Sequence, residues 1–181
     1  MAILTDQELA HRAADLEWIL CDADGVLTDG GLFYDRKGHG LMRFHVRDGL
    51  GMQLAQRAGL QVGVLSGRAS GALERRASEL KLDTLLMGVQ DKRAEFDAFL
   101  ERHNTVARRV AYIGDDLPDL VVLGQCGLSF APVDAAAEVR TVVHRVLQSA
   151  GGQGAVREAV EIILRAQGTW DSLFSSFTFD G

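Results

Sequence analysis

The sequence predicts an α/β fold: a Rossmann-like parallel sheet with helices on both faces, no cap domain and one projecting β-hairpin. Short apolar runs recur along the chain, and stretches of helical apolar periodicity separate them. This alternation favours a parallel sheet that is covered on both sides. Polar and acidic residues directly follow several of the apolar runs, and open α/β sheets build their sites at that edge.

The composition is typical of one globular domain that spans residues 1–181, with 47% hydrophobic and 24% charged residues. The formal net charge is -6 and no run of Lys or Arg is long, which argues against nucleic acid or an anionic membrane as the main partner. Cys21 and Cys126 lie far apart in apolar stretches, as buried thiols do. Because no signal segment opens the chain and no apolar run approaches ~20 residues, we expect a cytoplasmic protein.

The regular elements are predicted in chain order from these patterns. An amphipathic helix over residues 1–16 precedes a buried strand over 18–21, which ends abruptly in an acidic residue. Further strands are expected at 61–65, 84–87, 110–113 and 127–130, and helices between them at 49–58, 69–80 and 92–103.

Residues 30–46 interrupt this alternation with a hairpin pattern. Two apolar runs, 32–34 and 41–46, flank the polar turn 35–40. The hairpin is expected to project from the sheet, and its apolar residues Leu32, Phe33, Met42 and Phe44 favour burial against another chain.

The C-terminal part contains a glycine-rich run, a helix and an aromatic tail. Gly151, Gly152 and Gly154 predict a flexible joint before an amphipathic helix over 155–167. The tail, 168–181, carries Trp170 and several Phe residues among polar ones, and a frayed terminus is expected there.

Side chains able to do chemistry follow four of the predicted strands. Asp22 and Asp24 follow the first strand, Ser66 follows the second, and Lys92 begins the helix after the third. The fourth is followed by an acid cluster of Asp115, Asp116 and Asp119. Each element alone is weak evidence, but four in order predict one crevice at the carboxyl edge of the sheet.

Converging carboxylates repel one another and need a cation, and oxygen ligands of this kind suit Mg²⁺. A Ser and a Lys beside that ion complete a cradle for a phosphoryl group. In such a site one carboxylate is a credible nucleophile toward phosphorus, and the second acid of the D-x-D pair can transfer protons.

The order of Asp22-x-Asp24, Ser66, Lys92 and the acid cluster resembles the haloacid dehalogenase superfamily of phosphotransferases. The resemblance implies that Asp22 is the nucleophile and Asp24 the general acid/base. It further implies phosphate binding by Ser66, Gly67 and Lys92, and Mg²⁺ held by Asp22, Asp115 and the backbone carbonyl of Asp24. The presence of the second acid, Asp24, argues against dehalogenase activity.

Three longer runs, 21–30, 44–49 and 151–158, resemble one subfamily, the 3-deoxy-D-manno-octulosonate 8-phosphate phosphatases of lipopolysaccharide synthesis. The resemblance extends from about residue 18 to 167 and implies hydrolysis of that sugar-acid phosphate in a homotetramer whose sites are completed by neighbouring subunits. It implies substrate contacts from the following residues: Asp24, His45, Val46, Arg47, Asp48, Gly49, Arg68, Arg76, Lys92 and, from a neighbour, Arg157. Gln53 and Gln153 stand at positions where relatives in this subfamily can carry Arg.

Three alternatives stay open at this point. Sister enzymes of the subfamily act on nine-carbon sialic-acid-type 9-phosphates with the same core. A phospho-accepting receiver domain uses similar groups, but its acid pair comes first and its Lys last, whereas here an acid cluster follows Lys92. An inactive scaffold fits poorly with an intact set of site residues.

Overall fold

The computed structural model describes residues 4–38 and 40–177. Its centre is a six-stranded parallel sheet in the order β5-β4-β1-β6-β7-β8. The strands are β1 (Trp18–Cys21), β4 (Gln61–Leu65), β5 (Thr84–Leu86), β6 (Val110–Ile113), β7 (Leu128–Ala131) and β8 (Arg145–Val146). Because β1 lies between β4 and β6, the residues that follow these three strands meet at one edge.

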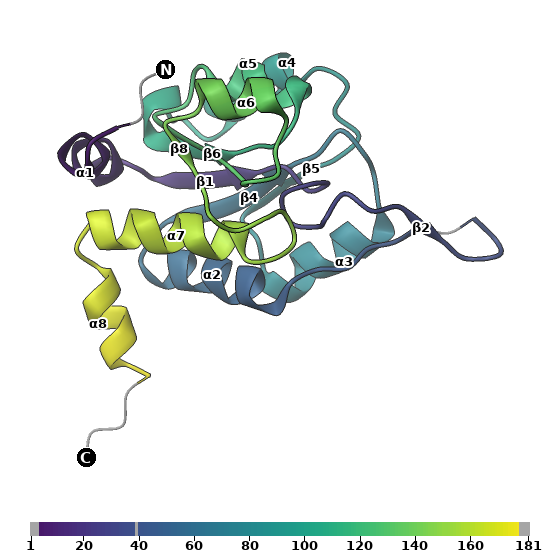
Figure 1. Ribbon diagram of the computed structural model, residues 1–181, viewed down its shortest axis with the longest axis horizontal. Helices are drawn as coiled ribbons and strands as arrows, with labels where there is room; N and C mark the ends of the chain where they lie inside the picture. Colours follow the sequence, from purple (N-terminus) through teal and green to yellow (C-terminus); the bar gives the residue numbers. More distant parts are fainter. Residues whose placement is uncertain (1–3, 39, 178–181) are drawn as a thin grey trace.

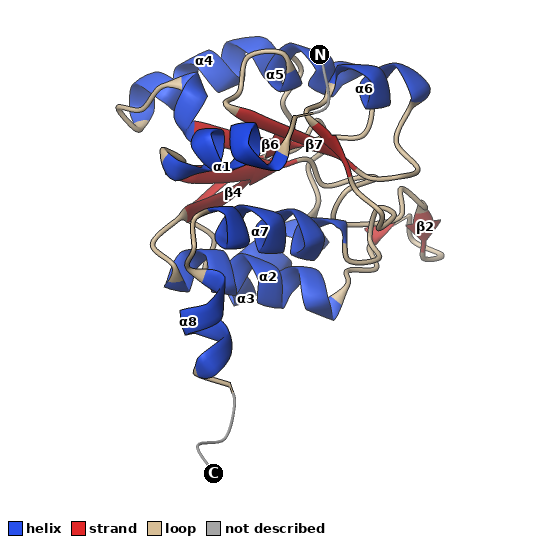
Figure 2. Cartoon of the chain, turned by 60° about the vertical axis from the view of Figure 1, so that its left-hand side comes forward, coloured by secondary structure: helices blue, strands red, loops and turns tan. Residues whose placement is uncertain are grey.

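Helices cover both faces of the sheet (Figure 2). One face carries α1 (Asp6–Ala14), α2 (Val46–Arg57), α3 (Gly71–Leu80) and α7 (Ala155–Ala166), and the other carries α4 (Lys92–Arg102), α5 (Leu120–Leu123) and α6 (Ala137–Val142). Alternate residues of β1 enter the two cores: Ile19 packs in the first, and Trp18 in the second. The predicted fold class is confirmed.

The hairpin projects from the sheet edge (Figure 1) but is shorter than predicted. β2 (Phe33–Tyr34) pairs with β3 (Gly40–Leu41). The expected strand over 41–46 is wrong beyond Leu41, because Met42 and Phe44 pack against the core and α2 already begins at Val46. Leu32 and Phe33 remain exposed, at 56% and 54%.

The C-terminal tail is not frayed over its described part. Residues Trp170–Ser175 form α8, and the Trp170 ring lies 5.5 Å and 4.6 Å from the guanidinium carbons of Arg157 and Arg165 on α7. These cation–π contacts fix the start of α8. Residues 178–181 of the predicted tail lie outside the described residues.

The structure contains several short elements that the sequence patterns do not predict. Two 3₁₀ turns, η1 (Ala107–Arg109) and η2 (Leu117–Asp119), flank β6, and α5, α6 and β8 follow. These pieces are too short to show a periodicity of their own. None of the described helices combines the length and apolar character needed to cross a membrane.

The glycine-rich run before α7 is closely packed, so the prediction of a flexible joint is wrong. Gly151 and Gly152 are buried. The Gly152 N–H donates to the Val26 carbonyl at 2.9 Å, and a Cβ on Gly151 would overlap the carbonyl oxygen of Gly25. The glycines therefore allow two backbones to approach each other, which is a different use of the residue from flexibility.

We predict that Gly151→Ala lowers the free energy of unfolding by ~2–4 kcal/mol, because the methyl group has no space beside the Gly25 carbonyl. Gly71→Ala is the matched control, since no heavy atom lies near a Cβ there and the position begins α3. It should leave stability unchanged or raise it by ~0.5 kcal/mol. Urea denaturation of both variants tests this, and equal effects would refute the packing argument.

Candidate active site

The ends of the neighbouring strands β1 and β6 bring the predicted acids together. Asp22 follows β1 and Asp115 follows β6 after one glycine. They face an open cleft of about 870 Å³. The residues that line it are Asp22, Asp24, Gly25, Gly30, Gly67, Arg68, Val89, Gln90, Asp91, Lys92, Asp115, Asp116, Pro118 and Val121.

Lys92 lies between two carboxylates at the floor of this cleft. It begins α4, whose N-cap Asp91 accepts two backbone N–H groups. The buried Lys92 Nζ is 3.0 Å from Asp22 Oδ2 and 2.7 Å from Asp119 Oδ1. Burial alone would lower the pKa of Lys92, but the charges of Asp119 and Asp22 outweigh it and raise the pKa above its ordinary value. The ammonium group therefore stays charged.

Asp119 connects Lys92 to the acid cluster. It is completely buried. Its Oδ1 accepts hydrogen bonds from Lys92 and from the Tyr112 hydroxyl, each at 2.7 Å. Its Oδ2 accepts the backbone N–H groups of Asp115 at 3.0 Å and Asp116 at 3.2 Å. The sequence did not predict a place for Tyr112 in the site, because a Tyr inside an apolar strand looks like an ordinary core residue.

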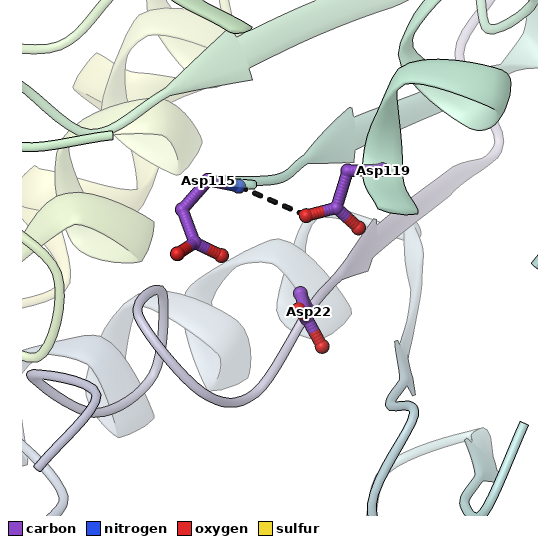
Figure 3. A group of neighbouring side chains, drawn as sticks. All are labelled: Asp22, Asp115 and Asp119. Atoms are coloured by element: carbon purple, nitrogen blue, oxygen red, sulfur yellow. Dashed lines mark hydrogen bonds between the residues drawn. The ribbon is translucent and has the colours of Figure 1, made fainter. Parts of the chain in front are cut away.

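Three carboxylates form a candidate cation site: one oxygen each of Asp22, Asp115 and Asp119 lies within 4.8 Å of the others (Figure 3). Asp119 already accepts four hydrogen bonds, whereas the buried Asp115 Oδ1 has no partner. Asp22 and Asp115 are therefore the acids with capacity for a cation. The side chain of Asp24 is not in this cluster, and the ligand role of its backbone carbonyl stays a prediction.

The pKa values of these acids also fit a cation-binding role. Burial, and then the charge of Asp119, raises the pKa of Asp22 to about 6 and that of Asp115 to about 8. Ionisation of both carboxylates is thus unfavourable, because they are desolvated and lie near other negative charges. A bound divalent cation offsets both effects, and hard cations prefer oxygen ligands of this kind. The donor set fits Mg²⁺.

A second hollow of about 440 Å³ adjoins the cleft, beneath the hairpin, and shares Asp24 and Arg68 with it. Ser66 lines this hollow; it is buried, and its Oγ accepts the Arg68 backbone N–H at 3.3 Å. An Arg68 guanidinium nitrogen lies 3.7 Å from Asp24 Oδ2. The two hollows together offer room for a phosphoryl group and a longer polar body.

The other predicted substrate contacts lie elsewhere within one chain. His45, Asp48, Gly49 and Arg76 line a narrow cavity between α2 and α3, and residues 45–49 form the N-cap and first turn of α2. Val46 and Arg47 are exposed in that turn. Arg157, on α7, lies beside Trp170. Their contacts with substrate stay predictions, as do the effects of Gln53 and Gln153.

Without a metal ion, we predict that stability falls as pH rises. The raised pKa values mean that the native state binds more protons than the unfolded chain above pH 3.8, through about 6 for Asp22 and about 8 for Asp115. These two groups make the free energy of unfolding decrease with pH across this window. Burial lowers the pKa of His144 to about 4, which acts in the opposite sense below pH 6.5, so the decrease is clearest from pH 6.5 to 8. Thermal melts from pH 4 to 8 in a chelator test this, and Mg²⁺ should add more stability at pH 8 than at pH 5. In Asp115→Asn the pH slope should flatten; an unchanged slope would contradict the assignment.

The chain is similar to known proteins both in sequence and in structure. No family model matches the chain. The chain is 41% identical over 160 residues to the 3-deoxy-D-manno-octulosonate 8-phosphate phosphatase KdsC of Haemophilus influenzae, covering 88% of this chain and 89% of the relative. It is 38% identical over 160 residues to KdsC of Yersinia pestis, covering 88% and 86%.

Solved structures give the same picture. A Pseudomonas syringae protein assigned to the YrbI family of phosphatases superposes with a TM-score of 0.94 at 36% identity, over 97% of this chain and 99% of that one. The Moraxella catarrhalis 3-deoxy-D-manno-octulosonate 8-phosphate phosphatase, in complex with magnesium, phosphate and KDO, gives 0.92 at 32% identity, over 95% and 99%. A Legionella pneumophila hydrolase assigned to the haloacid dehalogenase superfamily gives 0.90 at 35% identity, over 94% and 93%.

Proposed function

The chain belongs to the 3-deoxy-D-manno-octulosonate 8-phosphate phosphatases of the haloacid dehalogenase superfamily, and on this premise we propose that it releases phosphate from that sugar-acid ester in the cytoplasm, during lipopolysaccharide precursor synthesis. It is a phosphatase. The observation that carries the proposal is the position of Lys92, 3.0 Å from Asp22 at the floor of the acidic cleft. A cation beside a carboxylate at that edge suits an incoming phosphate ester.

In the proposed reaction an Asp22 oxygen attacks phosphorus and the bond from phosphorus to the sugar oxygen breaks. Asp24 gives its proton to the leaving oxygen, and an aspartyl-phosphate forms on Asp22. Asp24, now ionised, removes a proton from a water molecule that attacks the same phosphorus. Inorganic phosphate leaves, and the carboxylate of Asp22 is restored.

Ser66, Gly67 and Lys92 hold the phosphoryl oxygens in this scheme, because they line the two adjoining hollows beside Asp22. Asp22, Asp115 and the carbonyl of Asp24 hold Mg²⁺, which supplies charge neutralisation when bound. The cofactor is Mg²⁺, in keeping with the magnesium complex of the Moraxella relative.

The sugar acid phosphate needs a cation at each end, and within one chain the cleft offers Lys92 for the phosphate and Arg68 for the carboxylate. The other predicted substrate contacts come from residues 45–49, Arg76 and Arg157. In our proposal these residues meet the substrate of their own subunit or of a neighbouring one. We propose a homotetramer in which the hairpins of neighbours cover the open cleft. The exposed Leu32 and Phe33 support it, and light scattering measures it.

The test is phosphate release, with and without Mg²⁺, from the octulosonate 8-phosphate, a nine-carbon sialic-acid-type 9-phosphate and simple sugar phosphates. A strong Mg²⁺-dependent preference for the octulosonate ester is expected. Preference for the nine-carbon ester would keep the mechanism and change the substrate. No release from any ester would overturn the proposed function.

A further inference from the structure

We infer that Asp48 is a positioning residue for the metal site, acting through the glycine run 151–154 and the turn 25–28 on the carboxylate of Asp115. The inference rests on the proposed Mg²⁺-dependent function. The role that it assigns to Asp48 differs from the substrate contact that the family resemblance implies. Three links between contacting groups carry it.

The first link joins α2 to the start of α7. Asp48 lies in the first turn of α2 and is 1% exposed. Its Oδ1 accepts the N–H of Arg157 at 2.8 Å and its Oδ2 accepts the N–H of Gly154 at 3.2 Å. A carboxylate at the N-terminus of the twelve-residue α7 also interacts favourably with the helix dipole. Both oxygens are thus engaged within the protein, and Asp48 does not line the acidic cleft.

The second link joins the glycine run to the segment after β1. The run is held at several points: Asp134 accepts the Gly151 N–H at 2.9 Å, and Glu158 accepts the N–H groups of Gln148 and Ser149, each at 2.8 Å. Fixed in this way, the run lies directly on the turn. A Cβ on Gly151 would overlap the Gly25 carbonyl, and one on Gly152 would overlap the backbone at residues 28 and 29.

The third link joins this turn to the metal site. Gly25 has φ +84°, and a Cβ on it would overlap the carboxylate of Asp115. The turn therefore packs directly against that carboxylate. The buried Asp115 Oδ1 has no hydrogen-bond partner, so contact with the turn, rather than a hydrogen bond, limits the position of this oxygen. Movement of the turn changes the distance between the oxygens of Asp115 and Asp22.

The links join the three distant runs of the sequence that resemble the same subfamily. Residues 21–30 contain the turn, 44–49 contain the anchoring carboxylate, and 151–158 lie between them. Their shared task is to set the geometry behind the metal ligands. Outer-shell groups of this kind tune metal affinity without touching the ion.

The experiment compares Asp48→Asn with the wild-type chain. Asn keeps the volume, but its NH₂ group faces a backbone N–H where a carboxylate oxygen accepted it. Titration with MgCl₂, followed by thermal shift without substrate, should show Mg²⁺ binding weakened by ~10-fold. The KM for the octulosonate ester at saturating Mg²⁺ should change by less than ~2-fold.

Asp83→Asn is the matched control. Asp83 accepts the Val62 N–H at 2.8 Å at the opposite edge of the sheet, so its replacement lowers stability without touching the links. It should leave Mg²⁺ affinity unchanged. Should Asp48→Asn not fold, Asp134→Ala removes the acceptor of the Gly151 N–H from the exposed side, and an Mg²⁺ affinity equal to wild type there would overturn the inference.

Two results for Asp48→Asn would also overturn it. A raised KM with unchanged Mg²⁺ affinity assigns Asp48 to the substrate, and lower stability alone, as in Asp83→Asn, leaves it a purely structural role. If the wild-type chain releases phosphate from no ester but Mg²⁺ affinity still falls in Asp48→Asn, the positioning role stands and the proposed function fails.

Discussion

Asp22→Asn is expected to reduce turnover by ~10⁴-fold or more, while the metal-free protein becomes more stable at pH 8. The amide cannot attack phosphorus, so the proposed covalent route is lost. It also removes a charge that burial and Asp119 make unfavourable, which is the reason that the pKa of Asp22 is raised to about 6. Loss of activity together with a gain in stability distinguishes a reacting group from a structural one.

Phosphate release and thermal melts of Asp22→Asn, in chelator at pH 8, measure both effects. Asp97→Asn on the exposed face of α4 makes the same change of charge away from the cleft, and it should alter neither quantity. Turnover of Asp22→Asn near the wild-type rate would remove Asp22 from the role of nucleophile.

Lys92→Met is expected to cost both activity and stability. Without the ammonium group, Asp22 and Asp119 lose the cation at 3.0 Å and 2.7 Å from them, and Asp119 is completely buried. Leaving a buried charge without its partner costs ~3–5 kcal/mol of unfolding free energy. Loss of a preorganised positive group beside the transferring phosphoryl reduces kcat by ~10²–10³-fold.

Chemical denaturation and steady-state kinetics of Lys92→Met measure these losses. Lys37→Met, at an exposed position of the hairpin, is the control for removal of a lysine and should behave as wild type. The interpretation of Lys92 is wrong if the two variants prove equally stable and equally active.

The fold class was predictable because the patterns that indicate its strands and helices lie within short stretches of the sequence. Each long strand and helix shows its own apolar period, and the acids and the lysine that form the cleft stand directly after strands. A parallel sheet then brings them to one edge, as seen for Asp22, Lys92 and Asp115. The family membership now removes the receiver-domain and scaffold alternatives.

What the sequence did not reveal depends on partners far away in the chain. The run from Gly151 looks flexible by composition, and only its contact with Gly25 shows that it is packed. Helix α8 depends on Arg157 and Arg165 of α7. The role of Tyr112 depends on Asp119, and the N–H groups that Asp48 accepts, at the start of α7, are more than a hundred residues away from it.

The central place of β1 bears on how the protein loses activity when it is heated. β1 is hydrogen-bonded on both sides, by β4 and β6, and all four of its residues are buried. Its amide protons should therefore exchange with deuterium at the rate of global unfolding, whereas those of the exposed β2–β3 hairpin exchange much sooner. The segment that carries Asp22 is thus among the last to open, so thermal inactivation should follow unfolding of the whole sheet rather than local fraying at the site.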